Sequence, residues 1–227
     1  MWTQNGFRKY FFNTGYLVLE KVIRAFISFV VWAQVIRYLG PERFGVFSFV
    51  LSIVFLFGIL SDLGLDAIVV REIIRHPENE NQILGSTFTL KFVGSLLAIA
   101  LAFSLGWVFV RDIDVVMLIF IMSLQLIFKS FDTVDYYFQA HVQSKYSVYS
   151  KLISLSATTF FCLLFVYFRK SLIWFTAIVP VEIAIAGLAL FLFYVNISRR
   201  YASWSVSFEI IKNLLRKAWP LILSGIS

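Results

Sequence analysis

The chain has 227 residues, of which 60% are hydrophobic and only 15% are charged, and its mean hydropathy is +0.84. Soluble domains have roughly 45–50% apolar and about 25% charged residues, so this composition excludes a single soluble domain and indicates an integral membrane protein. The formal net charge is +7, from 20 Lys and Arg against 13 Asp and Glu. In a membrane protein such an excess is expected in the cytoplasmic connections, so we expect no nucleic-acid partner.

Apolar segments separated by charged ones predict six membrane spans. A helix needs about 20 residues to cross a bilayer, and each segment is long enough. The expected spans cover residues 11–36, 44–70, 84–110, 115–139, 149–168 and 172–195. Between the first two, Leu39-Gly40-Pro41 predicts a helix end, because glycine favours a helix terminus and proline cannot continue the helix. We therefore expect an all-α integral membrane fold, with a six-helix transmembrane bundle over residues 1–195.

The chain changes character after the sixth span. Residues 196–217 are basic, and the apolar positions of 208–215 have helical spacing, so we expect an amphipathic cytoplasmic connector on the membrane surface. Residues 218–227 begin another apolar run that is too short to cross a bilayer. We expect this run to be the truncated start of a seventh transmembrane helix, which makes the chain a fragment of a larger architecture.

The distribution of Lys and Arg predicts the orientation. If the N-terminus is cytoplasmic, the outer connections hold only Arg37, Arg43, Arg111, Arg169 and Lys170. The inner segments hold Arg8, Lys9, Arg71, Arg75, Lys145, Lys151, Arg199, Arg200, Lys212, Arg216 and Lys217. Because cytoplasmic loops are enriched in basic residues, we expect a multi-pass protein of the cytoplasmic membrane with its N-terminus inside.

Motifs for soluble chemistry are absent from the sequence. It contains neither a dinucleotide-binding glycine motif nor a P-loop. His76 and His141 stand alone without metal-ligand spacing, and the single cysteine, Cys162, cannot form an intrachain disulfide. The connections are too short for an extramembrane catalytic domain, so we expect neither an enzyme nor a cofactor or metal site.

Basic residues inside the expected spans are candidates for function, because each costs about 2.5–3.5 kcal/mol at the centre of a membrane helix. Lys21, Arg24 and Lys129 are the candidates to line a lumen and bind an anionic substrate. Arg24 can also pair with Glu20 at i,i+4 spacing, so a structural salt bridge is the alternative for that residue. Lys91 is expected to extend toward the membrane interface.

Acidic residues inside the spans are candidates for coupling transport to an ion. These candidates are Asp62, Asp66, Asp132 and Glu182. Asp62 and Asp66 are expected one turn apart on one helix, where they repel each other unless a cation lies between them. Asp132 is expected to pair with Lys129 at i,i+3 spacing, and Asp135 to be solvated. Glu182 follows Pro180, whose effect on the helix suits a segment that lines a cavity.

Two motifs carry a resemblance to a known family. The turn Arg37-Tyr38-Leu39-Gly40-Pro41-Glu42-Arg43-Phe44-Gly45 precedes Ser61-Asp62-Leu63-Gly64-Leu65, and Arg71 follows. This arrangement resembles the N-terminal half of polysaccharide biosynthesis transporters. These are the O-antigen-type lipid-linked oligosaccharide flippases, within the superfamily of MATE-like multidrug and polysaccharide exporters. On that resemblance, mostly structural roles are expected for Leu39, Gly40, Pro41, Gly45, Gly64 and Arg71.

The resemblance implies one six-helix half of a two-bundle transporter around a cationic lumen. Such proteins flip a lipid-diphosphate-linked oligosaccharide across the membrane by alternating access, for lipopolysaccharide or another surface polysaccharide. The implied partners are this substrate, membrane lipid, and either a missing C-terminal half or a second copy of the chain. Two alternatives stay open. One is a cation-coupled multidrug exporter of the same fold, which a lumen rich in Asp would favour. The other is a non-transporting scaffold that docks a glycan polymerase or glycosyltransferase through residues 196–217.

Overall fold

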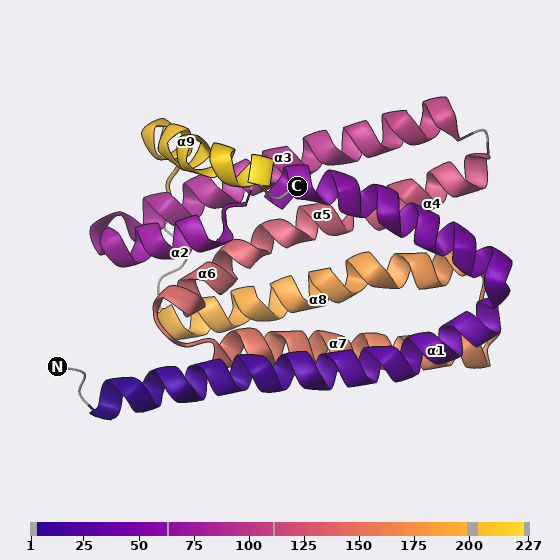
Figure 1. Cartoon of the computed structure of the whole chain (residues 1–227), viewed down its shortest axis with the longest axis horizontal. Helices are drawn as coiled ribbons and strands as arrows, with labels where there is room; N and C mark the ends of the chain where they lie inside the picture. Colours follow the sequence, from indigo (N-terminus) through magenta and orange to yellow (C-terminus); the bar gives the residue numbers. More distant parts are fainter. Residues whose placement is uncertain (1–3, 63, 111, 199–203, 225–227) are drawn as a thin grey trace.

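The computed structural model describes residues 4–62, 64–110, 112–198 and 204–224, and within these ranges the chain is helical without any strand (Figure 1). The predicted all-α class is therefore confirmed. Five helices are long and apolar enough to cross a membrane, as a multi-pass membrane protein requires. This count differs from the six spans expected, because one long helix contains both of the first two.

Helix α1 runs from Gln4 to Asp62 and turns back on itself at Gly40 (Figure 1). Gly40 has φ 74° and ψ 170°, a backbone conformation that is essentially restricted to glycine. The first arm ends at Leu39 and the second begins at Pro41. The apolar stretch Thr14–Ile59, which qualifies as one span, covers both arms and is about twice as long as one crossing requires.

A second glycine separates α1 from the next helix. Gly64 has φ 60°, and α2 (Asp66–Arg75) begins beyond it. The expected span over residues 44–70 is therefore wrong at its C-terminal end, because α1 already stops at Asp62. A short 3-10 turn, η1 (Pro77–Asn79), then leads into α3 (Glu80–Phe109).

The fourth expected span is divided into short segments. These are α4 (Ile113–Ser123), α5 (Gln125–Phe128), the 3-10 turn η2 (Lys129–Phe131) and α6 (Asp132–Ala140). A 3-10 stretch within a helix often marks a functional or strained point. The last two spans are the single helices α7 (Lys145–Tyr167) and α8 (Leu172–Ser198).

The long helices pack in two groups, each with its own apolar core. The first arm of α1 packs with α7 and α8 through Val31, Val35, Leu39, Cys162, Phe175 and Ile178. The second arm packs with α3, α4 and α5 through Phe47, Val50, Val54, Phe57, Ala98, Ile99, Ala102, Leu118, Ile119, Met122 and Leu126. The two groups meet where α8 passes η2. Gly187 of α8 lies so close to Phe131 of η2 that a Cβ added to the glycine would come within 2.9 Å of the Cβ of Phe131. The two groups thus form one bundle.

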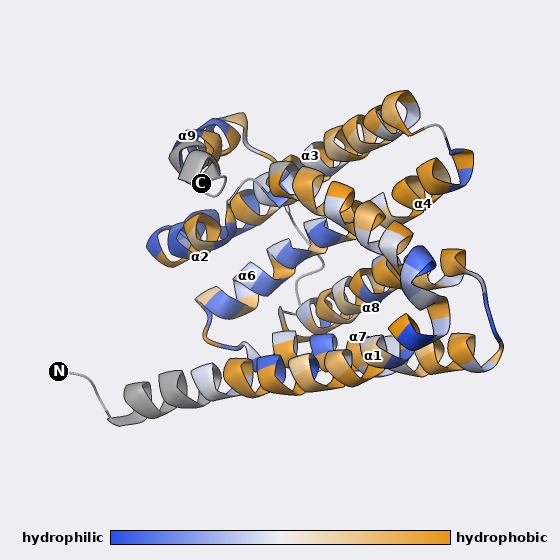
Figure 2. Ribbon diagram, turned by 45° about the vertical axis from the view of Figure 1, so that its right-hand side comes forward, coloured by the Kyte–Doolittle hydropathy of each residue, from blue (hydrophilic) through white to orange (hydrophobic). Residues whose placement is uncertain are grey.

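Large apolar side chains cover the outside of the bundle. Phe26, Phe29, Phe55 and Phe109 are each at least 70% exposed. Figure 2 shows hydrophobic residues along the long helices and hydrophilic residues concentrated on α2, α6 and α9. An apolar surface of this extent suits contact with lipid and does not suit contact with water.

Helix α9 (Phe208–Ser224) packs against α2 and α3. Its residues Leu214 and Ala218 share an apolar cluster with Leu65, Ile68 and Leu84. The apolar face expected on the membrane surface therefore packs against protein at Leu214. The helix also continues past residue 217 without a break, so the end of the connector and the start of the expected seventh span are one helix. Residues 199–203 and 225–227 of these two segments lie outside the described residues.

Candidate functional site

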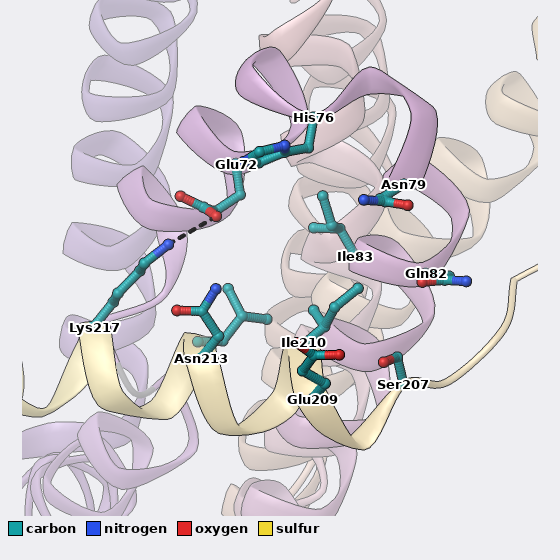
Figure 3. Close-up of a pocket in the computed structure, with 11 residues that line it drawn as sticks. Glu72, His76, Asn79, Gln82, Ile83, Ser207, Glu209, Ile210, Asn213 and Lys217 are labelled. Atoms are coloured by element: carbon teal, nitrogen blue, oxygen red, sulfur yellow. Dashed lines mark hydrogen bonds and ion pairs between the residues drawn. The ribbon is translucent and has the colours of Figure 1, made fainter.

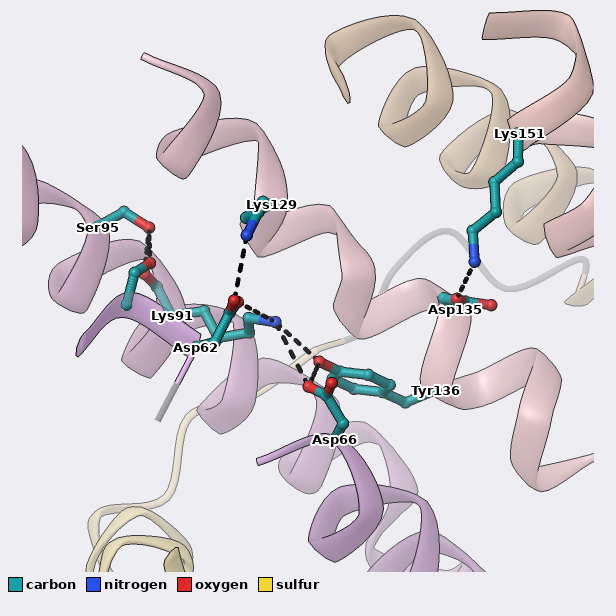
Figure 4. Close-up of polar contacts among 9 residues, drawn as sticks. Asp62, Asp66, Lys91, Ser95, Lys129, Asp135, Tyr136 and Lys151 are labelled. Atoms are coloured by element: carbon teal, nitrogen blue, oxygen red, sulfur yellow. Dashed lines mark hydrogen bonds and ion pairs between the residues drawn. The ribbon is translucent and has the colours of Figure 1, made fainter. Parts of the chain in front are cut away.

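Charged side chains within the bundle meet in two clusters. The lysine cluster consists of Asp62, Asp66, Lys91, Lys129 and Tyr136. The arginine cluster consists of Glu20, Arg24, Asp135, Lys151 and Glu182. Asp135 and Tyr136 are neighbours on α6 and point in different directions, Asp135 toward Lys151 and Tyr136 toward Asp66 (Figure 4). Helix α6 therefore connects the two clusters.

Lys91 of α3 lies at the centre of the lysine cluster, with a side chain that is only 1% exposed. Its Nζ is 3.3 Å from Oδ1 of Asp62 and 3.9 Å from Oδ1 of Asp66, and donates a 2.8 Å hydrogen bond to the hydroxyl of Tyr136. That hydroxyl donates in turn to Asp66. The other oxygen of Asp62, Oδ2, is 3.2 Å from Nζ of Lys129. These partners compensate the buried charge of Lys91, which would otherwise be very costly.

Two fully buried serines lie beside Lys91. The hydroxyl groups of Ser61 and Ser95 are 2.7 Å apart. Oγ of Ser95 also lies 2.7 Å from the carbonyl oxygen of Lys91 and 2.6 Å from that of Leu126. These contacts join the second arm of α1 to α3 and α5. The end of α1 is thus held by hydroxyl contacts as well as by the ion pairs of Asp62.

Arg24 joins three helices in the arginine cluster. Its Nε donates to Glu20 and its Nη1 to Glu182, each at 2.7 Å, and its Nη2 donates to the backbone carbonyl of Lys151 at 3.1 Å. The side chain of Lys151 pairs with Oδ2 of Asp135 at 3.2 Å. Glu20 is buried, whereas the side chains of Arg24 and Glu182 are each 31% exposed. The planar guanidinium with its five N–H donors suits this contact among α1, α7 and α8.

The three basic residues expected in a lumen have different surroundings. Lys21 is exposed and has no ion pair within the part of the chain that the structure describes. Arg24 makes the expected salt bridge to Glu20 and a second one to Glu182. Lys129 pairs with Asp62 of α1 at 3.2 Å and makes no ion pair with Asp132 among the described residues, so the expected pair with Asp132 is wrong. Arg24 and Lys129 thus belong to separate clusters.

The expected carboxylates are all placed near basic groups. Asp62 and Asp66 are close together, but not on one helix, because the chain turns at Gly64 between them. The ammonium between their carboxylates belongs to Lys91. Asp132, at the start of α6, interacts electrostatically with Lys91 and Asp62. Glu182 pairs with Arg24, as described above.

Sequence reasoning missed several members of the clusters. Lys91 does not extend to the membrane interface but is buried between two aspartates. Asp135 is 7% exposed and paired with Lys151, so its expected solvation is wrong. Tyr136 carries no charge and was not among the candidates, although its hydroxyl links Lys91 to an aspartate of another helix. Each of these contacts joins residues of different helices, so the spacing of residues along one helix could not predict it.

The motif residues of the family resemblance are Leu39, Gly40, Pro41, Gly45, Gly64 and Arg71. Gly40 and Gly64 have positive φ and determine where α1 turns and where α2 begins. Leu39 is buried against α7 and α8. Gly45 and Arg71 are exposed, and a Cβ added to Gly45 would meet open space. The motif therefore includes two positions at which the backbone requires glycine.

A polar pocket of about 410 Å³ lies at one end of the bundle between α2, α3 and α9 (Figure 3). Its lining includes Glu72, His76, Asn213 and Lys217, and Nζ of Lys217 lies 2.9 Å from Oε2 of Glu72. None of the residues of the two clusters lines this pocket. Among the described residues, no three His, Cys, Asp or Glu side chains are grouped to hold a metal ion.

The helices and their charged clusters define a multi-pass membrane protein whose spans are joined by ion pairs. A family model described as polysaccharide biosynthesis protein matches residues 11–227. The chain belongs to this polysaccharide biosynthesis protein family, which confirms the resemblance drawn from the two motifs. No curated protein and no solved structure matches the chain.

Proposed function

We propose that this protein flips a lipid-diphosphate-linked oligosaccharide across the cytoplasmic membrane, with its N-terminus inside, for the biosynthesis of a cell-surface polysaccharide. The observation that carries the proposal is membership of the polysaccharide biosynthesis family over residues 11–227. A large hydrophilic headgroup cannot cross hydrocarbon unaided, and charged groups between membrane helices commonly mark the path of a polar substrate. The two charged clusters support such a role.

Three basic residues are assigned to the diphosphate of the substrate. Lys21 makes the first contact, because its exposed ammonium has no carboxylate partner among the described residues. Arg24 lies three residues further on the same helix, where it is a spatial neighbour of Lys21. Its guanidinium is held in place by Glu20 and Glu182, so it presents a fixed edge to a phosphate oxygen. Lys129 is the third contact, on the other side of α6.

The proposal is tested by transport in proteoliposomes that contain the purified protein and a fluorescent polyprenyl-diphosphate-linked glycan. We expect Lys21→Met to lower the rate of flipping about tenfold, equivalent to the loss of one charged hydrogen bond. Lys212→Met, which changes another exposed lysine, on α9, should leave the rate unchanged. An unchanged rate in Lys21→Met overturns the assignment of that residue. Failure of the unmodified protein to flip the glycan lipid overturns the proposed function.

A cation-coupled exporter of the same fold is the second candidate, and the charge balance of the bundle favours it. In the two charged clusters, taken together with Lys21 and Asp132, the carboxylates are Glu20, Asp62, Asp66, Asp132, Asp135 and Glu182, and the basic groups are Lys21, Arg24, Lys91, Lys129 and Lys151. The carboxylates therefore outnumber the basic groups, which differs from the cationic lumen that the resemblance implied. An excess of carboxylate at membrane depth favours binding of protons or metal cations.

The two candidates differ in what an ion gradient alone can drive. A cation-coupled exporter moves a fluorescent dye out of vesicles when a proton or sodium gradient is imposed, with no glycan lipid present. If the protein flips the glycan lipid but no imposed gradient drives dye efflux, the exporter candidate is excluded.

A further inference from the structure

The carboxylate of Asp62 forms ion pairs with two lysines at once. Its Oδ1 is 3.3 Å from Nζ of Lys91, and its Oδ2 is 3.2 Å from Nζ of Lys129. The more exposed of these two ammonium groups, that of Lys129, can also bind a phosphate oxygen, because carboxylate and phosphate oxygens are both anionic acceptors. In the structure, this anion site is filled by a side chain of the protein.

The site is closed on one side and open on the other. Lys91 is 1% exposed and also donates to the hydroxyl of Tyr136. The side chains of Asp62 and Lys129 are 35% and 29% exposed. A molecule from outside the cluster can therefore reach the ion pair of Asp62 with Lys129, whereas Lys91 remains covered.

We propose that Asp62 competes with the anionic headgroup of the substrate for Lys129. Asp62 stays paired with Lys129 until a diphosphate displaces it. This inference rests on the proposed function and adds the residue that controls access to Lys129. Lys91 is a positioning residue in this scheme, because it holds Asp62 and does not itself contact the headgroup.

The charge of the cluster supports competition. Asp62 is the carboxylate that pairs with Lys129, whereas Asp66 lies near Lys91. A diphosphate that approaches this cluster is repelled by Asp62 and attracted by Lys129. Removing the charge of Asp62 lowers this repulsion and frees Lys129 in one step.

The position of Asp62 links the competition to the backbone. Asp62 is the last residue of α1, and the chain turns at Gly64 before α2 begins. Displacing Asp62 from Lys129 removes the ion pair between the end of α1 and η2. Headgroup binding at Lys129 thereby weakens the junction of two spans, which is the kind of differential contact that a ligand needs to shift a conformational equilibrium.

The test is a binding titration of the purified chain in a non-ionic detergent with farnesyl diphosphate, a soluble polyprenyl diphosphate. Asp62→Asn is expected to bind this probe about five- to tenfold more tightly than the unmodified protein. Lys129→Met is expected to bind it at least about fivefold more weakly. The matched control is Glu72→Gln, which removes the same charge from the pair with Lys217 outside both clusters and should change affinity less than about twofold. Farnesol, which has the same chain and no phosphate, should not distinguish the variants.

If Asp62 has a structural role alone, Asp62→Asn lowers the thermal unfolding midpoint and does not raise the affinity, because a disrupted fold does not bind more tightly. The competitor role predicts a lower midpoint together with a higher affinity. If the unmodified protein binds farnesyl diphosphate and Asp62→Asn binds it equally or more weakly, the competitor role is wrong and the proposed function stands. If none of these proteins binds farnesyl diphosphate, both the competitor role and the diphosphate substrate are contradicted. Inorganic diphosphate, titrated in parallel, shows whether the phosphates alone give the difference.

Discussion

Arg24 makes the polar contacts among α1, α7 and α8, in addition to the apolar core that these helices share. Arg24→Met leaves the buried carboxylate of Glu20 without a cation and removes the hydrogen bond to Glu182. Breaking a buried ion pair costs about 3–5 kcal/mol, and the partial exposure of Arg24 lowers the expected cost to roughly 2 kcal/mol. We expect the thermal unfolding midpoint in detergent to fall by about 4–8 °C.

Lys21→Met is the matched control for this prediction. Lys21 lies on the same helix, is exposed, and has no ion pair within the described ranges, so its midpoint should change by less than about 1 °C. Arg24→Lys should recover only part of the loss, because an ammonium cannot reproduce the forked contact of a guanidinium. Equal midpoints for Arg24→Met and Lys21→Met would contradict the structural role of Arg24.

Gly85 allows the segment before α9 to approach α3. A Cβ at position 85 would overlap the backbone carbonyl of Ser205, and the neighbouring Ser86 accepts a 3.0 Å hydrogen bond from the backbone N–H of Ser207. Gly85→Ala should therefore displace this segment and speed its cleavage in limited proteolysis roughly tenfold. Gly15→Ala, where an added Cβ meets open space, should be cleaved at the unmodified rate. The same rate in both variants would show that this close approach does not hold the segment.

Lys91 shows why the lysine cluster could not be fully predicted from the sequence. The depth of Asp62 and Lys129 in apolar segments was enough to identify them as candidates, and the structure brings them together. Lys91 looked similar to any lysine near a helix end. It shares one buried face of α3 with Ser95 and Ala98, at spacings of four and seven residues. The position of a lysine on the same face of α3 as small residues could have indicated that it is buried. Its partners, however, lie on three other segments that only the tertiary fold brings together.

At the scale of elements, the helix ends were predictable where the backbone itself determines them. The Leu-Gly-Pro sequence predicted the turn at Gly40, because glycine and proline act locally. The end of α1 at Asp62 was missed, since the apolar pattern continues through Leu65 to Val70 while Gly64 turns the chain. The division of α4, α5, η2 and α6 was missed because hydropathy does not report a change of helix type.

The turn at Gly40 gives a prediction for α1 as a whole. Gly40→Ala forces a residue with a Cβ into φ 74° and ψ 170°, which costs about 1–3 kcal/mol. The thermal unfolding midpoint should fall by roughly 2–12 °C. Gly45→Ala, five residues further in the helical second arm, has open space for a Cβ and should be neutral or slightly stabilising. A midpoint for Gly40→Ala equal to that of Gly45→Ala would show that the corner does not need glycine.

At the scale of the whole molecule, the connections gather at two opposite ends. The corner of α1 and the turn between α7 and α8 lie at one end, where the hydroxyl of Tyr38 donates to the carbonyl of Lys170 at 2.9 Å (Figure 1). The turns between α2 and α3 and between α6 and α7 lie at the other end. The exposed basic residues Arg71, Arg75, Lys212 and Arg216 belong to α2 and α9, near this second end. Since cytoplasmic loops are enriched in Lys and Arg, the second end is expected to face the cytoplasm.

Single cysteines test this orientation, and the chain suits the method because its one cysteine, Cys162, is buried and can be replaced by alanine. In right-side-out vesicles, Glu42→Cys and Lys170→Cys should react with a membrane-impermeant maleimide. Glu78→Cys and Lys145→Cys, both exposed at the opposite end, should react only after the membrane is permeabilised. The reverse pattern would invert the orientation and leave the fold intact. Reaction of one residue from each end on the same side would contradict the arrangement of the spans, because α1 then could not turn back across the membrane at Gly40.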